Sequence, residues 1–363
     1  MKTFFFLGDF LLEGETSLNI DDFAENFREA DEVICNFEGV MGDGFRAIDK
    51  AGPVVCQHSN AARCLVRMGI TAVTTCNNHS YDYGEEALNH TEEKLRFAGI
   101  RVLGSSRSGS KRPTDFALVD GVAIINACEA HPVLLNGELI DPLPQNEQLF
   151  SEKLRDVIAA HKELGSKVIV CVHAGLELVD VPLKLFRQRY RDLIDAGADV
   201  VIAHHPHVPQ GFEEYSGRPI FYSLGNFMFQ RGRKGGEDVN GLVVKLTYNG
   251  SEFSYETYSV KVDYAKNNLS LMPHDFLLLN ECLSNDASYQ KMLKAASRVH
   301  ANVIEGALPL LHTRSLGSWL KLIFNLTFRP AWLRRRRQLI SNLVEINESY
   351  KALIREPSCT HKK

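Results

Sequence analysis

The sequence lacks the features that mark several large protein classes. Its 363 residues include eight cysteines but no CxxC pair. Their irregular spacing argues against a zinc ribbon and against a disulfide framework. No run of 18 or more apolar residues is present to span a membrane as a helix. The formal net charge of −4 gives no basic excess, so specific nucleic-acid binding is not expected.

The amino end has little in common with a secretion signal. Its apolar run, residues 3–7, is short and is followed at once by Gly8-Asp9, without a small-residue cleavage site. Cysteines such as Cys171 lie inside apolar runs, which is typical of buried thiols in a reducing compartment. We therefore expect a soluble cytoplasmic protein. Contact with the inner membrane surface is a further expectation, which rests on the C-terminal segment described below.

Buried strands alternate with amphipathic helices over most of the chain, and this predicts an α/β fold with mostly buried sheets. The principal strand signals lie at 3–7, 32–37, 70–75, 168–172, 200–203 and 220–224, with a closing hairpin at 242–248 and 252–262. The helical patterns lie at 20–30, 59–68, 83–98, 148–164 and 183–196. No strand signal follows. The sequence therefore divides into an α/β domain, 1–265, and a helical, basic extension, 266–363.

Polar side chains follow five of the predicted strands directly. In open α/β sheets, ligands bind beyond the carboxyl ends of strands, so residues far apart in the sequence can meet there. Carboxylate, amide oxygen and imidazole together suit Mn²⁺, Fe²⁺ or Zn²⁺. The polar residues concerned are Asp9, Asn36, Glu38, Asn78, His79, Asp82, His173, His205 and His207.

Taken singly, each of these clusters also has a structural interpretation. Gly8-Asp9 could form a turn or a helix cap, and Asn77-Asn78 an Asx turn. His173 alone fits a hydrogen-bonded core histidine. Pro206 disfavours a helical backbone in the preceding residue, which predicts an extended His205. The ordered set of clusters, each behind a strand, is what predicts a divalent metal site.

Five sequence blocks resemble the CapA family of bacterial capsule and poly-γ-glutamate biosynthesis proteins (the PgsA/CapA type). The resemblance covers roughly residues 3–260. It implies a calcineurin-like metallophosphoesterase fold, which is a four-layer α/β/β/α sandwich with metals at one sheet edge. The blocks are NFEG at 36–39, NNHSYDYG at 77–84, HAGLE at 173–177, AHHPHVPQ at 203–210 and IFYSLGNFMF at 220–229.

The resemblance also implies roles for individual residues. One or two divalent ions (Mn, Fe or Zn) would be the cofactor, and His79 would act as a general acid. In the mechanism expected of such a site, Asn36, Asp82, Glu177 and Asn226 would orient ligands or substrate. For Asp82 and Glu177 a surface or capping role is the alternative, and for Asn226 a structural hydrogen bond to the loop backbone. The positions that match metal ligands are Asp9, Glu38, Asn78, His173, His205 and His207.

The chain departs from the family pattern at two places. Ordinary metallophosphoesterases begin with Asp-x-His, but here Phe10-Leu11 follows Asp9, so one ligand of the first metal is missing or is replaced by Glu38. Ala174 and Ala203 stand where the family often has Trp and Gly. The first of these could reshape the pocket wall.

Two functions remain open on these grounds. The first is a metal-dependent hydrolase that acts on a phosphoester or an amide in capsule or poly-γ-glutamate metabolism. The second is a non-catalytic accessory subunit that binds the polymer or the synthesis proteins. The expected partners are therefore an anionic polymer or a phosphorylated substrate, and capsule-synthesis proteins.

The carboxyl end carries a distinct charge pattern. Residues 306–344 contain no acidic residue but seven basic ones, among them the run 334–337. Such a basic, aromatic-rich segment suggests peripheral membrane contact through 312–340. The alternative is that its apolar side chains pack on the α/β core while its arginines face water.

Overall fold

The computed structural model describes residues 1–48, 54–103, 116–128, 133–135, 138–140, 152–230, 239–263, 266–273, 280 and 283–293. The predicted basic segment at 312–340, and with it most of the predicted extension, lies outside these residues. No helix within the described ranges is long and apolar enough to cross a membrane.

Most of the described strands belong to two sheets. The larger contains eight strands, of which β1 to β4 run parallel and β14 to β16 antiparallel. In sheet order they are β16 (Asn268–Pro273), β15 (Phe253–Asp263), β14 (Val239–Tyr248), β1 (Lys2–Leu11), β2 (Glu32–Phe37), β3 (Ala72–Thr74) and β4 (Arg101–Leu103), and β13 (Asn226–Phe229) pairs with β1 near its end.

The second sheet contains six strands, and its central four are parallel. In sheet order they are β11 (Pro209–Tyr215), β12 (Arg218–Leu224), β10 (Val200–His204), β9 (Lys167–His173), β6 (Val122–Cys128) and β5 (Phe116–Val119). A separate small hairpin consists of β7 (Val133–Leu135) and β8 (Glu138–Ile140).

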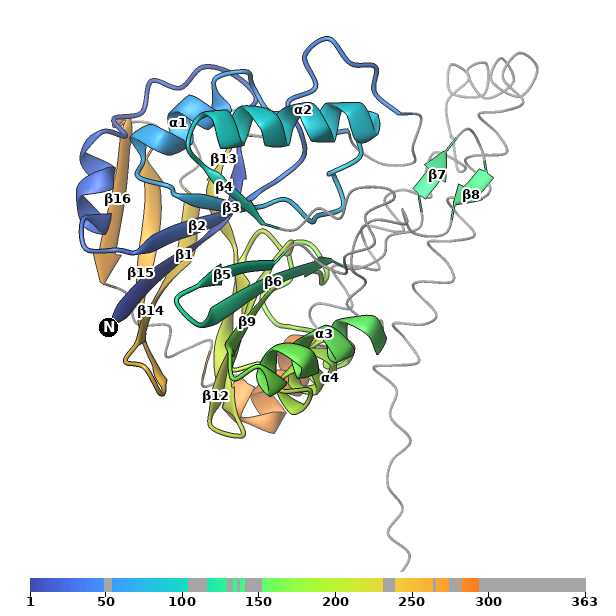
Figure 1. Ribbon diagram of the computed structural model, residues 1–363, viewed down its shortest axis with the longest axis vertical. Helices are drawn as coiled ribbons and strands as arrows, with labels where there is room; N and C mark the ends of the chain where they lie inside the picture. Colours follow the sequence, from blue (N-terminus) through green and yellow to red (C-terminus); the bar gives the residue numbers. More distant parts are fainter. Residues whose placement is uncertain are drawn as a thin grey trace, which may run out of the picture.

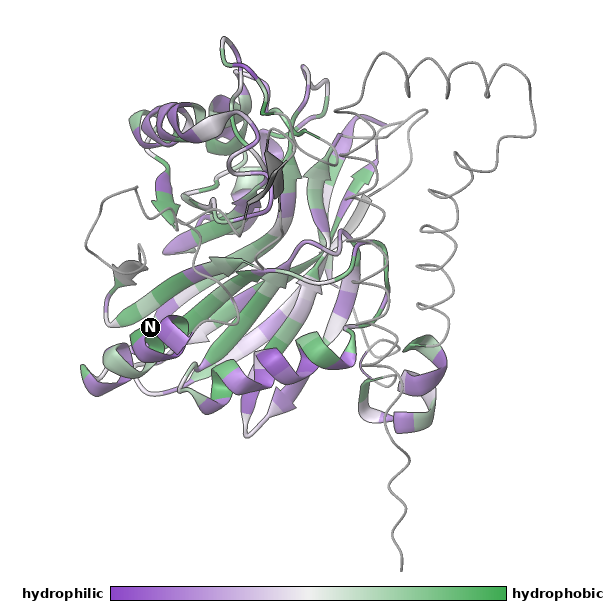
Figure 2. Ribbon diagram, turned by 90° about the vertical axis from the view of Figure 1, so that its right-hand side faces the viewer, coloured by the Kyte–Doolittle hydropathy of each residue, from purple (hydrophilic) through white to green (hydrophobic). Residues whose placement is uncertain are grey.

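Helices cover the outer face of each sheet, as Figure 1 shows. The 3₁₀ helix η1 (Asp22–Phe27), α1 (Ala61–Arg67) and α2 (Gly84–Phe97) lie on the larger sheet, and α3 (Glu152–Glu163) and α4 (Lys184–Asp195) on the smaller. Figure 2 shows hydrophobic strands in the interior and helices with hydrophilic outward faces. The four-layer α/β/β/α prediction is therefore confirmed.

The alternation of side chains along β1 explains how the layers hold together. Phe4 and Phe6 point between the two sheets, where they pack against residues of the second sheet such as Ile202. Phe5 and Leu7 point to the other face, toward the helices. Successive side chains of a strand face opposite ways, so a strand buried on both faces must be apolar throughout. This accounts for the uninterrupted run at 3–7.

Three sequence-based expectations about the elements are wrong. A strand does follow residue 265, because β16 extends the larger sheet by pairing with β15. The helix expected at 20–30 is the shorter 3₁₀ helix η1. The strands β11 and β13 were not expected, because Pro209 at the start of β11 and Gly225 just before β13 are residue types that indicate turns. Residues beyond β16 also pack on the core, where Tyr289 donates a hydrogen bond of 2.8 Å to the Pro182 carbonyl.

One partly buried ion network ties α4 to the second sheet. Glu213 of β11 accepts hydrogen bonds from Arg191 at 2.7 and 2.9 Å, and from Arg187 and the Tyr222 hydroxyl. Burial alone would raise the pKa of Glu213, but these donors outweigh it and lower the pKa to about 2. The network therefore stabilises the fold while Glu213 is ionised.

Replacing Glu213 with glutamine is expected to lower the free energy of unfolding by about 2–4 kcal/mol, because two half-buried arginines lose their counter-charge. Since the folded pKa lies below the ordinary value of 4.5, the stabilisation is present above pH 4.5 and is lost as the pH falls toward 2. Urea denaturation at several pH values measures this. Glu256→Gln, at an exposed pair with Lys245, is the control and should change little. An equal loss in both variants would contradict the prediction.

Candidate metal centre

Asp9 is the centre of the candidate site and lies within β1, two residues before its end at Leu11. It pairs in register with Asn36 of β2 on one side and with Asn226 of β13 on the other. The register of both ladders shifts next to Asp9, which marks a β-bulge or a similar irregularity. Bulges redirect side chains and are common beside active sites. The expected end of the strand at Gly8-Asp9 is thus an irregularity inside a longer strand.

Two glycines allow β13 to approach β1 at this point. The amide of Asp9 donates a 2.9 Å hydrogen bond to the Gly225 carbonyl. A Cβ atom at Gly8 would lie 2.0 Å from that carbonyl oxygen, which no real structure tolerates. Gly225 has φ +67°, in the left-handed region that favours glycine.

Gly8→Ala is therefore expected to lower the free energy of unfolding by about 2–3 kcal/mol and to weaken metal binding, because β13 must move away from Asp9. Thermal unfolding, with and without Mn²⁺, measures both effects. Gly14→Ala is the matched control, because a Cβ atom there would meet nothing within 4 Å. If the Gly8 variant unfolded like the control, the close approach of the two strands would not matter.

Asp9, Glu38 and His207 lie close enough together to form one set of metal ligands. One ligand atom each from Asp9, Glu38 and His207 lies within 4.8 Å of the other two. Nδ1 of His207 is 3.2 Å from the Asp9 carboxylate, and its Nε2 is 3.6 Å from Glu38. Nδ1 of His207 also lies 3.0 Å from Oδ1 of Asn226. All of these residues were expected at the site from the sequence.

A second set of donors lies beside the first. Nε2 of His173 is 3.0 Å from Oδ1 of Asn78 and 3.1 Å from Nδ1 of His205. Donor atoms about 3.0–3.4 Å apart are spaced as neighbouring ligands around one ion with bonds of about 2.1 Å. Asn36 links the two sets, since its amide donates to Asp9 at 2.8 Å and contacts Nδ1 of His173 at 3.2 Å.

The turn that carries the two histidines is strained. His205 has φ +98° and His207 has φ +60°, both in a region that non-glycine residues rarely adopt. The expectation of an extended His205 is therefore wrong. The His205 amide lies 3.3 Å from Oδ2 of Asp9 while the ring contacts His173, and these contacts hold the unusual backbone. Strain of this kind is concentrated at functional sites.

His79, like His207, lies close to Oε1 of Glu38. Its Nε2 lies 3.9 Å from Oε1 of Glu38, and its Nδ1 is 2.7 Å from Oδ2 of Asp82. The same carboxylate oxygen of Asp82 accepts the Val55 amide at 2.7 Å. Asp82 is thus buried and fixed, and the alternative of a surface carboxylate is excluded. Its position orients His79 with Nε2 toward the ligands.

The Glu38 carboxylate has an unsatisfied environment. It is 1% exposed, and its Oε2 has no hydrogen-bond partner among the described residues. Burial raises the pKa of Glu38 to about 8, against the attraction of His207. Burial alone would lower the pKa of His207, but the charges of Glu38 and Asp9 raise that pKa to about 10. Burial and the neighbouring rings hold the pKa of His173 well below its usual value.

These observations fit a divalent cation. A buried carboxylate oxygen without a partner is costly unless it is paired with a charge or coordinates a metal. Carboxylates and neutral imidazoles form the donor set that Mn, Fe and Zn accept. Asp9, Glu38 and His207 could hold one ion, and His173, His205 and Asn78 a second. The missing Asp-x-His histidine is compatible with this, because Glu38 stands beside Asp9.

Of the site residues predicted from the sequence, Glu177 is the least connected to the others. It is exposed on the loop between β9 and α4, and its interactions with described residues include no hydrogen bond to a histidine. Its charge still acts on Glu38 and His207. The orientation of a histidine by Glu177 is therefore not seen, and a role toward substrate stays a prediction.

Sequence reasoning missed three polar residues that build the site. His204, with its pKa lowered by burial, lies 3.1 Å from the Leu7 carbonyl and joins the two sheets. Gln57 accepts the Leu12 amide and donates to the Phe10 and Glu38 carbonyls. Asn126 accepts the Cys76 amide at 2.9 Å. Only His204 carried a signal, as a polar residue that ends a strand.

The family model "Bacterial capsule synthesis protein PGA_cap" matches residues 3–231, which confirms the resemblance. The PGA biosynthesis protein CapA of Bacillus subtilis (strain 168) is 29% identical over 233 residues, covering 62% of this chain and 60% of that protein. A probable polyglutamine synthesis accessory protein of Mycobacterium tuberculosis is 23% identical over 240 residues, covering 60% of each.

The chain thus spans about 60% of the length of these curated relatives. Among solved structures, sulfate thiohydrolase SoxB of Thermus thermophilus matches with a TM-score of 0.41 and 10% identity, covering 81% of this chain and 53% of that one.

Proposed function

Because the chain belongs to the bacterial capsule synthesis protein PGA_cap family, we propose that it is a metal-dependent hydrolase acting on an anionic envelope polymer such as poly-γ-glutamate, or on a phosphorylated substrate. The observation that carries this proposal is the meeting of Asp9, Glu38 and His207 with an unpaired buried oxygen on Glu38. His79 beside this set supplies a group for proton transfer. We propose Mn²⁺, Fe²⁺ or Zn²⁺ as the ion.

The chain's own residues have separable tasks in such a reaction. A bound divalent ion would polarise the substrate oxygen and lower the pKa of water. Asp82 holds Nδ1 of His79 at 2.7 Å, so Nε2 is the atom that can pass on a proton. In hydrolysis, water adds to the phosphorus or carbonyl carbon and loses a proton to solvent. The bond to the leaving group breaks, the leaving atom takes the proton from Nε2, and solvent restores that proton. Asn36 and Asn226 orient Asp9 and His207.

The test is a turnover assay on the purified chain with Mn²⁺. Bis-p-nitrophenyl phosphate reports phosphodiester cleavage, and γ-glutamyl-p-nitroanilide reports amide cleavage. Turnover of one of them should be abolished by chelation and by His207→Ala. His90→Ala is a control, since that ring packs on Phe45. If metal binds and neither compound nor poly-γ-glutamate is cleaved, the hydrolase proposal fails.

The second candidate is a non-catalytic accessory subunit for polymer synthesis. The observation that favours it is the departure from Asp-x-His at Phe10-Leu11, together with a relative named as a synthesis accessory protein. Complementation of a polymer-deficient strain separates the two. A His79→Ala chain that restores polymer formation fully supports the accessory function, and one that restores none supports the hydrolase. The cytoplasmic location, the partner proteins and the membrane contact stay predictions.

A further inference from the structure

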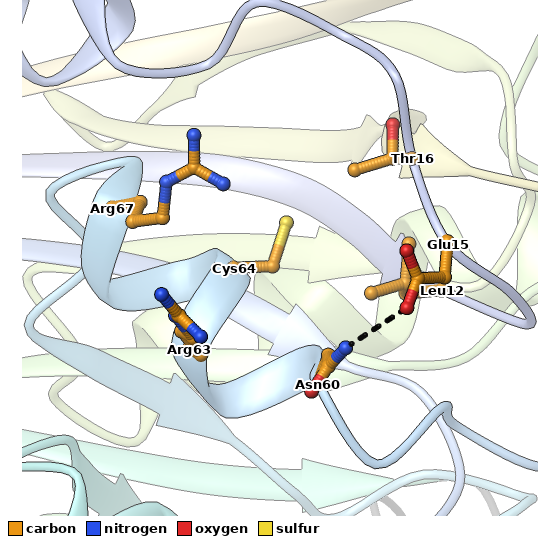
Figure 3. A pocket seen from close by; sticks show the side chains of 7 residues that line it. All are labelled: Leu12, Glu15, Thr16, Asn60, Arg63, Cys64 and Arg67. Carbon is orange, nitrogen blue, oxygen red and sulfur yellow. Dashed lines mark hydrogen bonds between the residues drawn. The ribbon is translucent and has the colours of Figure 1, made fainter.

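A cavity lies between α1 and the segment that follows β1, outside the metal centre (Figure 3). It measures about 310 Å³, at the small end of the range for ligand sites, which suits one or two amino-acid residues. Leu12 and Cys64 supply its apolar lining. Its polar lining consists of Glu15, Thr16, Asn60, Arg63 and Arg67.

The two walls of this cavity carry opposite charges. Arg63 and Arg67 belong to α1, and Glu15 stands on the segment after β1, as Figure 3 shows. Asp21 holds Arg67 by two hydrogen bonds of 2.8 Å. Arg63, by contrast, forms no ion pair or hydrogen bond in the part of the chain that the structure describes. Its guanidinium is thus free to bind a carboxylate with two parallel hydrogen bonds.

Glu15 offers the complementary group. Its one polar contact among the described residues is a 3.5 Å hydrogen bond from the Asn60 side-chain amide, at the limit of such bonds. A free guanidinium and a weakly engaged carboxylate on facing walls suit a ligand with both charges. Such a ligand gains two charge-assisted interactions, whereas a simple anion would be repelled by Glu15.

We propose that this cavity is a binding site for an α-amino-acid headgroup, with Arg63 on its carboxylate and Glu15 on its ammonium. Poly-γ-glutamate, the polymer proposed above, carries such a headgroup only at its amino-terminal residue. A γ-linked glutamyl chain keeps both the α-ammonium and the α-carboxylate on its amino-terminal residue. An α-linked chain uses that carboxylate in its peptide bond. The site would therefore recognise the amino end of a γ-glutamyl chain, an assignment that rests on the proposed function for its polymer.

The cavity is connected to the metal centre through the backbone of β1. Leu12 lines the cavity and stands three residues after Asp9, about 10 Å along a strand. Gln57 is buried and joins the two places, since it accepts the Leu12 amide and donates to the Glu38 carbonyl. Occupation of the cavity can therefore position a chain end at a fixed distance from the metal ligands.

Titration calorimetry on the full, Mn²⁺-loaded chain tests the site with tri-γ-glutamate and tri-α-glutamate. The γ-linked peptide should bind at least about tenfold more tightly than the α-linked one. Arg63→Gln and Glu15→Gln should each weaken γ-peptide binding at least about tenfold. Arg28→Gln, an exposed arginine paired with Glu25, should leave it unchanged. Metal content, measured in parallel, should be equal in all variants.

Equal affinity for the two peptides, absence of binding, or a γ-affinity that Arg63→Gln leaves intact would overturn the site. Competition by inorganic phosphate as strong as by the γ-peptide would show an anion site instead, and would overturn it as well. Loss of turnover with Arg63-dependent γ-peptide binding intact would count against the hydrolase alone. Turnover without such binding would count against this cavity alone.

Discussion

Glu38→Gln is expected to lower the affinity for a divalent ion at least about 100-fold while leaving the metal-free protein as stable or more stable. The variant replaces one charged ligand of the Asp9, Glu38 and His207 set with a neutral amide. Losing a ligand costs more metal affinity than changing a residue that only hydrogen-bonds to a ligand. Without an ion, however, a buried carboxylate with an unpaired oxygen opposes folding. The two readouts should therefore move in opposite directions.

The pKa of Glu38 shows in which direction Glu38→Gln should change the stability of the metal-free protein. The folded pKa of Glu38, at about 8, lies above its ordinary value of 4.5, so ionisation favours the unfolded chain. The cost is absent below pH 4.5 and grows as the pH rises toward 8. With a chelator present, Glu38→Gln should gain about 1–2 kcal/mol over the natural chain between pH 5 and 8.

Urea denaturation and equilibrium dialysis against Mn²⁺ measure the two effects. Glu25→Gln, in an exposed pair with Arg28, is the control for a lost surface charge and should affect neither. A Glu38 variant that binds Mn²⁺ as tightly as the natural chain would remove Glu38 from the ligands. A variant that is less stable in chelator would show that Glu38 has a stabilising partner.

His79→Asn is expected to lower the turnover number about 10²- to 10⁴-fold while leaving the bound metal and the fold unchanged. His79 is 3.9 Å from Glu38 and is held by Asp82, so it stands beside the ligands without belonging to the set of three. Asp82→Asn should reduce turnover as well, because the ring would lose the carboxylate that orients Nε2. A general acid acts on the leaving group, so substrates with a good leaving group should be less affected.

Comparing p-nitrophenyl and alkyl esters in both variants tests this. The loss should be several-fold smaller for p-nitrophenolate, whose departure needs little protonation. If His79→Asn lost the metal together with turnover, His79 would be a ligand instead of the proton donor. If turnover were unchanged with both leaving groups, it would have no part in the reaction.

The chemistry of the site could be expected from the sequence because strands end in recognisable residues. An apolar run followed by Asn36 and Glu38, or by His173, shows where a parallel strand delivers polar side chains. The rule that parallel strands present their carboxyl ends at one edge then brings distant residues together. For this reason the structure places His207 near Asp9, although the two are 198 positions apart in the sequence (207 − 9).

Local rules failed where tertiary contacts decide the backbone. The preference of a residue before proline predicted an extended His205, but contacts with Asp9 and His173 hold its φ at +98°. Asn77 illustrates the opposite case. Its side chain accepts the His79 amide at 3.2 Å, which is the hydrogen bond of the Asx turn that local chemistry predicted here.

Other features depend on neighbours that no short pattern encodes. The irregularity at Asp9 and the strand β13 exist because Gly8 lets the Gly225 carbonyl approach. Gln57 lies in a stretch without periodic signal, yet it connects β1 to the Glu38 backbone. Its role follows only when β1 and the segment after β2 are placed side by side in three dimensions.

Metal content after equilibrium dialysis tests the central claim most directly. The natural chain, His207→Ala and His90→Ala would be dialysed against Mn²⁺ and Zn²⁺, and bound metal counted by inductively coupled plasma mass spectrometry. The natural chain and His90→Ala should retain one or two ions per chain, and His207→Ala should lose at least one. A natural chain that binds no ion, or a His207 variant that binds as many as the natural chain, would contradict the claim that Asp9, Glu38 and His207 form a metal site.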